Sequence, residues 1–152
     1  MIRGLTIAAA IIGLGISAVG AQQPDAAVAL QSLMRANGKS IYGDLSRMSK
    51  GDVPYSQATV DAALAQLEDA SKKLPSMFPD AAKNPAPGAK YKPSAKVWAP
   101  ENKADFEAKL ANFAKAVQSV KGTIKDVDTL KPGFATINGS CNGCHETYQE
   151  RT

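Results

Sequence analysis

The sequence predicts an all-α fold, an antiparallel four-helix bundle in up-down-up-down order. Apolar residues recur at steps of three and four through four segments of the chain, which is the periodicity of helices that bury one face. The sequence lacks the alternating runs of β-branched residues that are typical of strands. Short connections between such helices favour antiparallel neighbours.

The first helix is expected at about residues 25–48 and the second at about residues 56–74. Ser56 is a suitable N-cap for the second helix, because its hydroxyl can accept a hydrogen bond from a free backbone N–H of the first turn. Pro75 should end that helix, and residues 51–54 should form the turn between the two helices. The expected core-facing residues are Leu30, Met34, Ile41, Leu45, Met48, Val60, Leu64, Leu67 and Leu74.

The third helix should begin near Pro100 or Glu101, and the fourth should occupy about residues 129–151. Pro132 falls near the expected start of the fourth helix, where a first turn tolerates proline. The apolar face of the third helix consists of Phe106, Leu110, Phe113, Val117, Val120 and Ile124. The apolar face of the fourth consists of Leu130, Phe134, Ile137, Cys141, Cys144 and Tyr148.

The motif Cys141-Asn142-Gly143-Cys144-His145 contains both cysteines and the only histidine of the chain. Two thiols at this spacing can each add to a vinyl group of haem, and the adjacent imidazole can then bind the iron. We interpret Cys141 and Cys144 as the attachment points of one covalent haem c, and His145 as the proximal iron ligand. A thioredoxin-like pair would need a βαβ setting and a zinc site would need four ligands, so both alternatives fit poorly.

The second axial ligand cannot be another histidine, which leaves a methionine or an open position. Pairing the first and fourth helices antiparallel places His145 level with about position 31. Met34 is then only about 4.5 Å away along the bundle, whereas Met48 is about 25 Å away and should be ordinary core. Met77 lies beyond the second helix at the same end of the bundle. Met34 is therefore the first candidate, Met77 the second, and an open site the third.

The stretch between the second and third helices is too rich in proline for a long helix. We expect a long ordered loop that partly covers the haem as a lid, with a simple crossover as the alternative. Trp98, the only tryptophan, should either cover the haem edge or anchor this loop in the core.

Residues 1–21 have the pattern of a signal peptide: a basic start at Arg3, an apolar run and small residues before position 22. The apolar run is short for a bilayer span, which needs about 20 apolar residues. We therefore expect cleavage, a mature haem domain of residues 22–152 that is not membrane-bound, and a periplasmic location. Export agrees with the motif, because c-type haem is attached outside the bacterial cytoplasm.

The mature chain is mildly basic, because loss of Arg3 leaves 17 of the 18 basic residues beside 14 acidic ones, a formal charge of +3. This charge is too small to indicate nucleic acid, so redox proteins are the expected partners, and a homodimer stays open. Residues 81–100 contain four lysines and no acidic residue, which predicts either a basic rim that steers an acidic partner or a solvated loop. The lysines are Lys83, Lys90, Lys92 and Lys96.

The mature chain resembles the class II cytochromes c, which are four-helix bundles with CxxCH near the C-terminus, as in cytochrome c′. It is most similar to the low-spin cytochrome c-556 branch. This resemblance implies that Met34 is the axial ligand opposite His145. The matching residues are Leu33-Met34-Arg35-Ala36-Asn37-Gly38, Pro54-Tyr55, Leu74-Pro75, Phe78-Pro79 and Val97-Trp98.

A haem with histidine and methionine ligands has a higher reduction potential than a bis-histidine haem, and its filled axial positions block the binding of oxygen or peroxide. No catalytic acid, base or nucleophile is apparent, so we expect a periplasmic one-electron carrier and not an enzyme. The alternative is a five-coordinate protein of the cytochrome c′ type that binds NO or CO. A third alternative is a helical binding protein with an incidental CxxC.

Glycines at positions 133, 139 and 143 should each weaken the fourth helix by roughly 0.5–1 kcal/mol relative to alanine. We expect packing on the haem to offset this loss, so the haem-free protein should be poorly folded.

Overall fold

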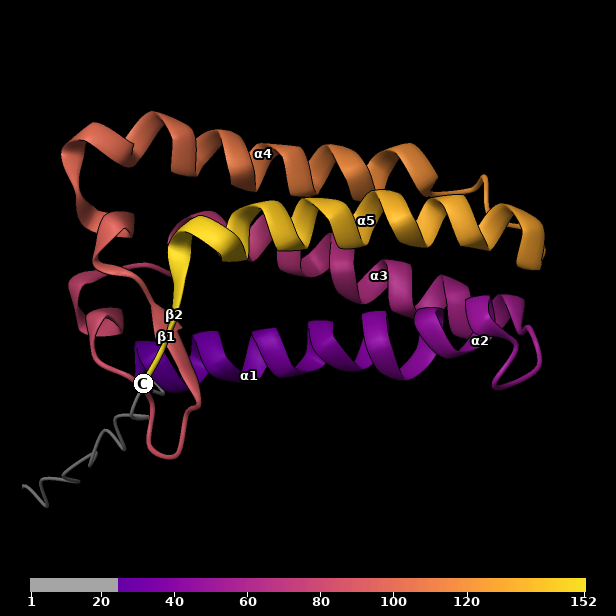
Figure 1. Cartoon of the computed structure of the whole chain (residues 1–152), viewed down its shortest axis with the longest axis horizontal. Helices are drawn as coiled ribbons and strands as arrows, with labels where there is room; N and C mark the ends of the chain where they lie inside the picture. Colours follow the sequence, from indigo (N-terminus) through magenta and orange to yellow (C-terminus); the bar gives the residue numbers. More distant parts are fainter. Residues whose placement is uncertain (1–24) are drawn as a thin grey trace, which may run out of the picture.

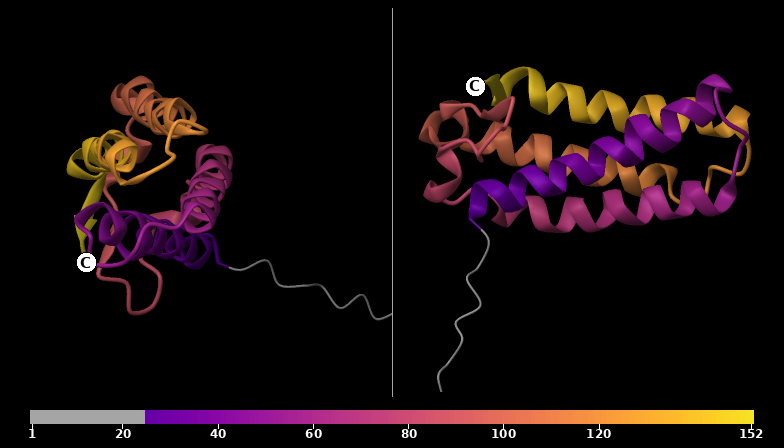
Figure 2. Two further views of the ribbon diagram at one scale, coloured as in Figure 1. Left: turned by 90° about the vertical axis from the view of Figure 1, so that its right-hand side faces the viewer. Right: turned by 90° about the horizontal axis from the view of Figure 1, so that it is seen from below.

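The computed structural model describes residues 25–152, so the predicted signal peptide and its cleavage point lie outside the described residues. Four long helical segments lie side by side, and each runs antiparallel to the one before it, as Figures 1 and 2 show. The prediction of an up-down-up-down four-helix bundle is confirmed. Within residues 25–152, no helix is both long and apolar enough to cross a membrane.

The first segment is a continuous helix made of α1 (Ala26–Gly38), the π-helical turn η1 (Lys39–Leu45) and α2 (Ser46–Lys50). The side chain of Asp25 caps it by accepting a hydrogen bond from the backbone N–H of Ala27 at 2.9 Å. It ends at Gly51, whose φ of 80° is left-handed and therefore favours glycine.

The second segment is α3 (Gln57–Lys73), and its predicted boundaries are confirmed. The Ser56 hydroxyl accepts a hydrogen bond from the N–H of Thr59 at 3.3 Å, as expected of the N-cap. The helix tightens into the short 3₁₀ turn η2 (Leu74–Ser76), which contains Pro75.

The third segment begins with the 3₁₀ turn η5 (Pro100–Asn102) at the predicted position and continues as α4 (Lys103–Val120). Ile124 was expected on this helix, but it lies beyond the helix end. Its side chain is still only 1% exposed, because the connection to the next helix folds it back into the core. The apolar periodicity therefore predicted its burial correctly and its secondary structure wrongly.

The fourth segment is α5 (Val127–Tyr148), two residues earlier at its start than predicted and three residues shorter at its end. A capping box between Asp126 and Thr129 sets the start, because each residue's side chain bonds the other's backbone N–H. Pro132 consequently lies in the helix interior, and the expectation that it falls in the first turn is wrong.

Gly133 in α5 is buried where the helix approaches Ile124 closely. A Cβ at this position would lie 2.8 Å from Cδ1 and 3.1 Å from Cγ1 of Ile124, both under normal contact. Gly139, two turns further on, is exposed, and a Cβ there would meet nothing within 4 Å.

These surroundings predict opposite effects for two alanine substitutions. Gly139→Ala should raise the free energy of unfolding of the holoprotein by about 0.5–1 kcal/mol, because alanine is the better helix former. Gly133→Ala should lower it by about 1–3 kcal/mol, because overpacking against Ile124 outweighs that gain. Chemical denaturation of both variants checks the pair, and stabilisation by Gly133→Ala would contradict the close approach.

The segment between the second and third helices is ordered as short elements: η3 (Asp80–Lys83), β1 (Tyr91–Pro93) and η4 (Ala95–Trp98). Strand β1 pairs antiparallel with β2 (Gln149–Arg151), which follows α5 directly. The apolar periodicity predicted helix as far as residue 151, so the two-stranded sheet corrects that prediction. Each strand has three residues, which is too short for an alternating pattern to show.

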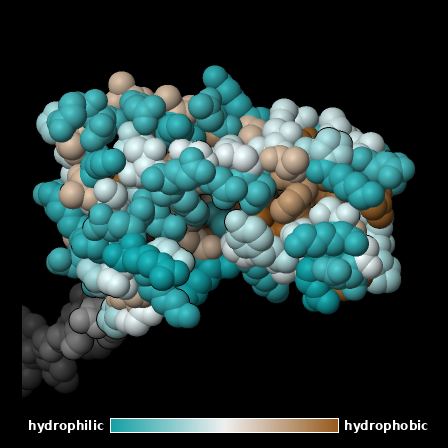
Figure 3. Space-filling view, viewed as in Figure 1, coloured by the Kyte–Doolittle hydropathy of each residue, from teal (hydrophilic) through white to brown (hydrophobic). Residues whose placement is uncertain are grey.

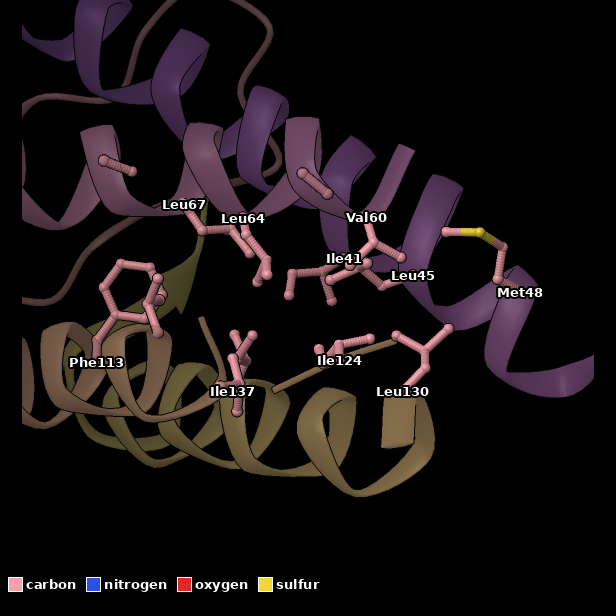
Figure 4. Close-up of a cluster of buried hydrophobic side chains, with 14 of the residues drawn as sticks. Ile41, Leu45, Met48, Val60, Leu64, Leu67, Phe113, Ile124, Leu130 and Ile137 are labelled. Carbon is pink, nitrogen blue, oxygen red and sulfur yellow. The ribbon is translucent and has the colours of Figure 1, made fainter. Parts of the chain in front are cut away.

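The main core runs along the bundle axis, and Figure 4 shows its apolar side chains facing one another from all four helical segments. Met48 is 1% exposed and lies at the end of this cluster near Leu130, so its prediction as ordinary core is confirmed. A smaller cluster of Val97, Phe106 and Tyr148 lies at the end of the bundle where α5 finishes. The face seen in Figure 3 is mainly hydrophilic, with apolar side chains showing in its right-hand half.

Candidate functional site

A cavity of about 730 Å³ lies at one end of the bundle, between α1, α4, α5 and the segment before β1. Ligand and cofactor sites typically have volumes of about 300–1,000 Å³, so the cavity has room for a large planar cofactor. Four of the residues singled out from the sequence meet in its wall. They are Met34, Cys141, Cys144 and His145.

The two cysteines and the histidine lie on one side of α5, within its last two turns. Their spacing of three and four residues puts them on the same helical face, as predicted. The two thiols are free and half-buried.

Before haem is attached, both thiols are protonated at neutral pH. Burial raises the pKa of the Cys141 thiol to about 11, and burial is also the main cause of the raised pKa of Cys144. Lys109 opposes the shift at Cys144, while Asp105 adds to it. This environment does not suit a thiolate metal centre or a low-pKa redox pair, which need stabilised thiolates.

The imidazole of His145 is half-buried at the cavity wall. Burial lowers its pKa, and among the described residues no hydrogen bond or charged group contributes to the shift. The ring is therefore neutral at pH 7, which is the form in which histidine binds iron.

The methionines differ in their relation to the cavity. Met34 reaches its wall from α1, whereas Met77 packs against the main core and does not line the cavity. The register of the first and fourth helical segments also brings Met34 close to His145. It is marked by the hydroxyl of Tyr42, which donates a hydrogen bond to Oδ1 of Asn138 at 3.2 Å. This pairing places His145 level with about position 35, nearer to Met34 than the sequence-based register of about 31.

The remaining wall fits a cofactor with an apolar body and acidic side groups. Its apolar part includes the side chains of Leu30, Phe78, Phe106, Leu110 and Phe113. Its cations are Arg35, Lys90, Lys92 and Lys109, and among the described residues no aspartate or glutamate joins them. A haem, whose ring is apolar and whose two propionates are anionic, matches both properties.

The last turn of α5 is anchored through Tyr148, which is 4% exposed. Its hydroxyl donates a hydrogen bond to Oδ2 of Asp105 at 2.6 Å, and this bond is the main reason that the pKa of Tyr148 rises to about 12. Phe106 packs edge-on against both Tyr148 and Phe78, with ring centroids 4.9 Å apart in each pair. The apolar pattern predicted a core position for Tyr148, but no feature of the sequence pointed to Asp105.

Trp98 is not one of the residues that line the cavity. It anchors the segment before α4. Its Nε1 donates a hydrogen bond to the carbonyl oxygen of Phe78 at 3.0 Å. Of the two roles considered for this residue, the structure favours the anchor.

Two of the four lysines in the predicted basic rim form ion pairs. Lys83 pairs with Asp80 at 2.8 Å, and Lys92 pairs with Glu150 at 3.1 Å. Both acidic partners lie outside residues 81–100, so a charge count over that window did not include them. Lys90 lines the cavity and forms no ion pair with the described residues.

Comparisons with known proteins agree with this geometry. The family model described as Cytochrome C′ matches residues 25–149. Cytochrome c-556 of Rhodopseudomonas palustris is 44% identical over 99% of this chain and 99% of the relative, and cytochrome c′ of the same organism is 32% identical over 99% and 97%. An NMR-validated structural model of oxidized R. palustris cytochrome c556 has a TM-score of 0.73 at 43% identity, and covers 86% of this chain and 99% of that chain. The chain therefore belongs to the cytochrome c′ family and carries haem c.

Proposed function

We propose that this protein is a periplasmic one-electron carrier whose haem c is attached through Cys141 and Cys144 and held axially by His145 and Met34. The observation that carries the proposal is the placement of Met34 and His145 in the wall of the same cavity, on antiparallel helices and at nearly the same height. Neither Met48 nor Met77 lines this cavity, so neither competes for the place opposite His145.

The haem supplies the one-electron chemistry, and the protein residues set its conditions. Two axial side chains leave no position for an added ligand. The apolar wall keeps water from the ring, and the cations of the wall offset the propionate charges. His145 is the only histidine and acts here as an iron ligand, which supports a carrier and not an enzyme.

The periplasmic location rests on the pattern of residues 1–21 as a cleaved signal peptide, which leaves residues 22–152 as the haem domain. Mass spectrometry of the exported holoprotein tests this part. The proposal expects a chain that begins at Gln22 and carries the added mass of one haem, and a retained residue 1 would contradict it.

A potentiometric titration of the holoprotein tests the carrier assignment. We expect a reversible one-electron transition, and a lower midpoint potential in Met34→Leu, because a soft thioether stabilises ferrous iron and leucine does not. An unchanged potential in this variant would exclude Met34 as the ligand that tunes the iron.

We further propose that the partner docks electrostatically beside the cavity, where Lys90 is exposed and pairs with no acidic side chain of residues 25–152. Lys90→Glu should slow oxidation of the reduced protein by ferricyanide several-fold at low ionic strength, and high salt should remove most of this difference. Lys115→Glu makes the same charge change at an exposed position of α4 that does not line the cavity, and should have a smaller effect. Equal effects of both variants would refute local steering.

A further inference from the structure

Residues 148–152, at the end of α5 and just beyond it, bind residues 89–94 of the connection between the second and third helical segments. Strands β1 and β2 pair in the register Tyr91 with Arg151, Lys92 with Glu150, and Pro93 with Gln149. Figure 1 shows the two strands together at the end of the bundle where α5 finishes. We call residues 89–94 together with residues 148–152 the β clasp.

Hydrogen bonds extend the clasp on both sides of the strands. The N–H of Ser94 donates to the carbonyl oxygen of Tyr148 at 2.9 Å, and the N–H of Thr152 donates to that of Lys90 at 3.2 Å. The hydroxyl of Thr152 donates to the carbonyl oxygen of Ala89 at 2.7 Å. The clasp therefore holds residues 89–94 along most of their length.

The segment that the clasp holds is also one wall of the haem cavity. Most residues from Asn84 to Pro93 line the cavity, and Gln149 of β2 joins them. Residues 84–90 form no helix or strand, and within them Ala86 is the buried anchor, at 5% exposure. The part of the wall that follows Ala86 is therefore held mainly by the clasp.

A ladder of three residue pairs is a weak element compared with the helices. Isolated two-stranded hairpins are at best marginally stable in water, and regions with few buried contacts open far more often than a helical core. The strands are half-exposed to exposed, and their only ion pair among the described residues, Lys92 with Glu150, is on the surface. The clasp can therefore open while the bundle stays folded.

We propose that the β clasp is the gate through which small molecules reach the haem cavity, and that the fraction of time it is open sets their rate of entry. This inference rests on the proposed attachment of haem in the cavity, but it does not require that Met34 binds the iron. It assigns a function to residues 89–94 and 148–152 that lies outside the iron-ligand set.

The register of the ladder provides matched variants. In an antiparallel pair, hydrogen-bonded and non-hydrogen-bonded residue pairs alternate. The bonds of Ser94 with Tyr148 and of Thr152 with Lys90 put Glu150 at a hydrogen-bonded position and Arg151 at a non-hydrogen-bonded one. Proline at position 150 removes a ladder bond, whereas proline at position 151 removes an N–H that points away from β1.

The experiment measures the association rate of CO with the ferrous holoprotein in a Met34→Ala background, where the position opposite His145 is open. Glu150→Pro should raise this rate roughly tenfold, the effect of losing one or two backbone hydrogen bonds from the closed state. Thr152→Ala, which loses only the hydroxyl bond to Ala89, should raise it by a smaller factor. Glu150→Ala keeps the N–H, and Arg151→Pro keeps the ladder bonds and loses only the exposed cation–π contact of Arg151 with Tyr91, so both should stay within about twofold of the parent.

An unchanged rate in both Glu150→Pro and Thr152→Ala would overturn the gate, as would an equal increase in Arg151→Pro. If Glu150→Pro fails to fold, Thr152→Ala decides alone. The spectrum of the Met34→Ala parent, recorded before CO is added and compared with that of the unsubstituted protein, tests the iron ligand separately. A wrong assignment of Met34 is therefore distinguishable from a wrong assignment of the gate.

Discussion

Met34→Leu is expected to convert the haem from a low-spin to a high-spin spectrum and to remove the methionine–iron charge-transfer band of the ferric protein. Leucine has nearly the volume of methionine and such exchanges usually cost under about 1.5 kcal/mol, so the bundle should stay folded. Only the thioether sulfur is lost, and with it the sixth iron ligand. Optical spectra of the oxidised and reduced holoprotein measure the change.

Two other methionines provide the controls. Met77→Leu alters a side chain that packs against the core outside the cavity wall, and Met48→Leu alters one that is 1% exposed. Both variants should keep the spectrum of the unsubstituted protein. A high-spin spectrum in Met77→Leu, with Met34→Leu unchanged, would reverse the assignment of the ligand.

The double substitution Cys141→Ser and Cys144→Ser is expected to abolish cooperative folding after haem is extracted. Without haem the apolar wall of the 730 Å³ cavity is left facing water, and the contacts that the haem ring would make with Leu30, Leu110 and Phe113 are lost. A domain is stable by only about 5–15 kcal/mol, so the loss of these contacts is a large fraction of the total. Pro132 in the interior of α5 adds to it, because proline disrupts an α-helix that is not held by packing.

Circular dichroism during thermal unfolding checks this expectation. The haem-free double variant should show no sharp transition, whereas the unsubstituted holoprotein should unfold cooperatively. Gly139→Ala in the haem-free chain is a useful companion, because it strengthens α5 without touching the cavity. A sharp transition near that of the holoprotein would mean that the bundle does not need haem to fold.

The helices could be predicted because each carries its own pattern. Periodicity and a cap such as Ser56 are local, so they need no knowledge of the rest of the chain. The start of α5 was predicted two residues late because it is set by the capping box of Asp126 and Thr129, which lies outside the apolar stripe. The π-helical turn at residues 39–45 has no comparable local pattern in the sequence.

The parts of the site that one helix or one helix pair determines could also be predicted. Cys141, Cys144 and His145 share a face because of their spacing, and the antiparallel register brings Met34 near them. The rest of the wall depends on contacts between distant segments. Lys92 pairs with Glu150, 58 positions later, and a charge count over one loop cannot include such a partner.

The most direct test of the central claim, that His145 and Met34 fill both axial positions, is the optical spectrum of the purified holoprotein with and without CO. We expect a low-spin ferric spectrum with the methionine–iron charge-transfer band, and a ferrous spectrum that CO does not change. A high-spin spectrum that shifts promptly on addition of CO would contradict it. The protein would then be a five-coordinate, gas-binding member of the family.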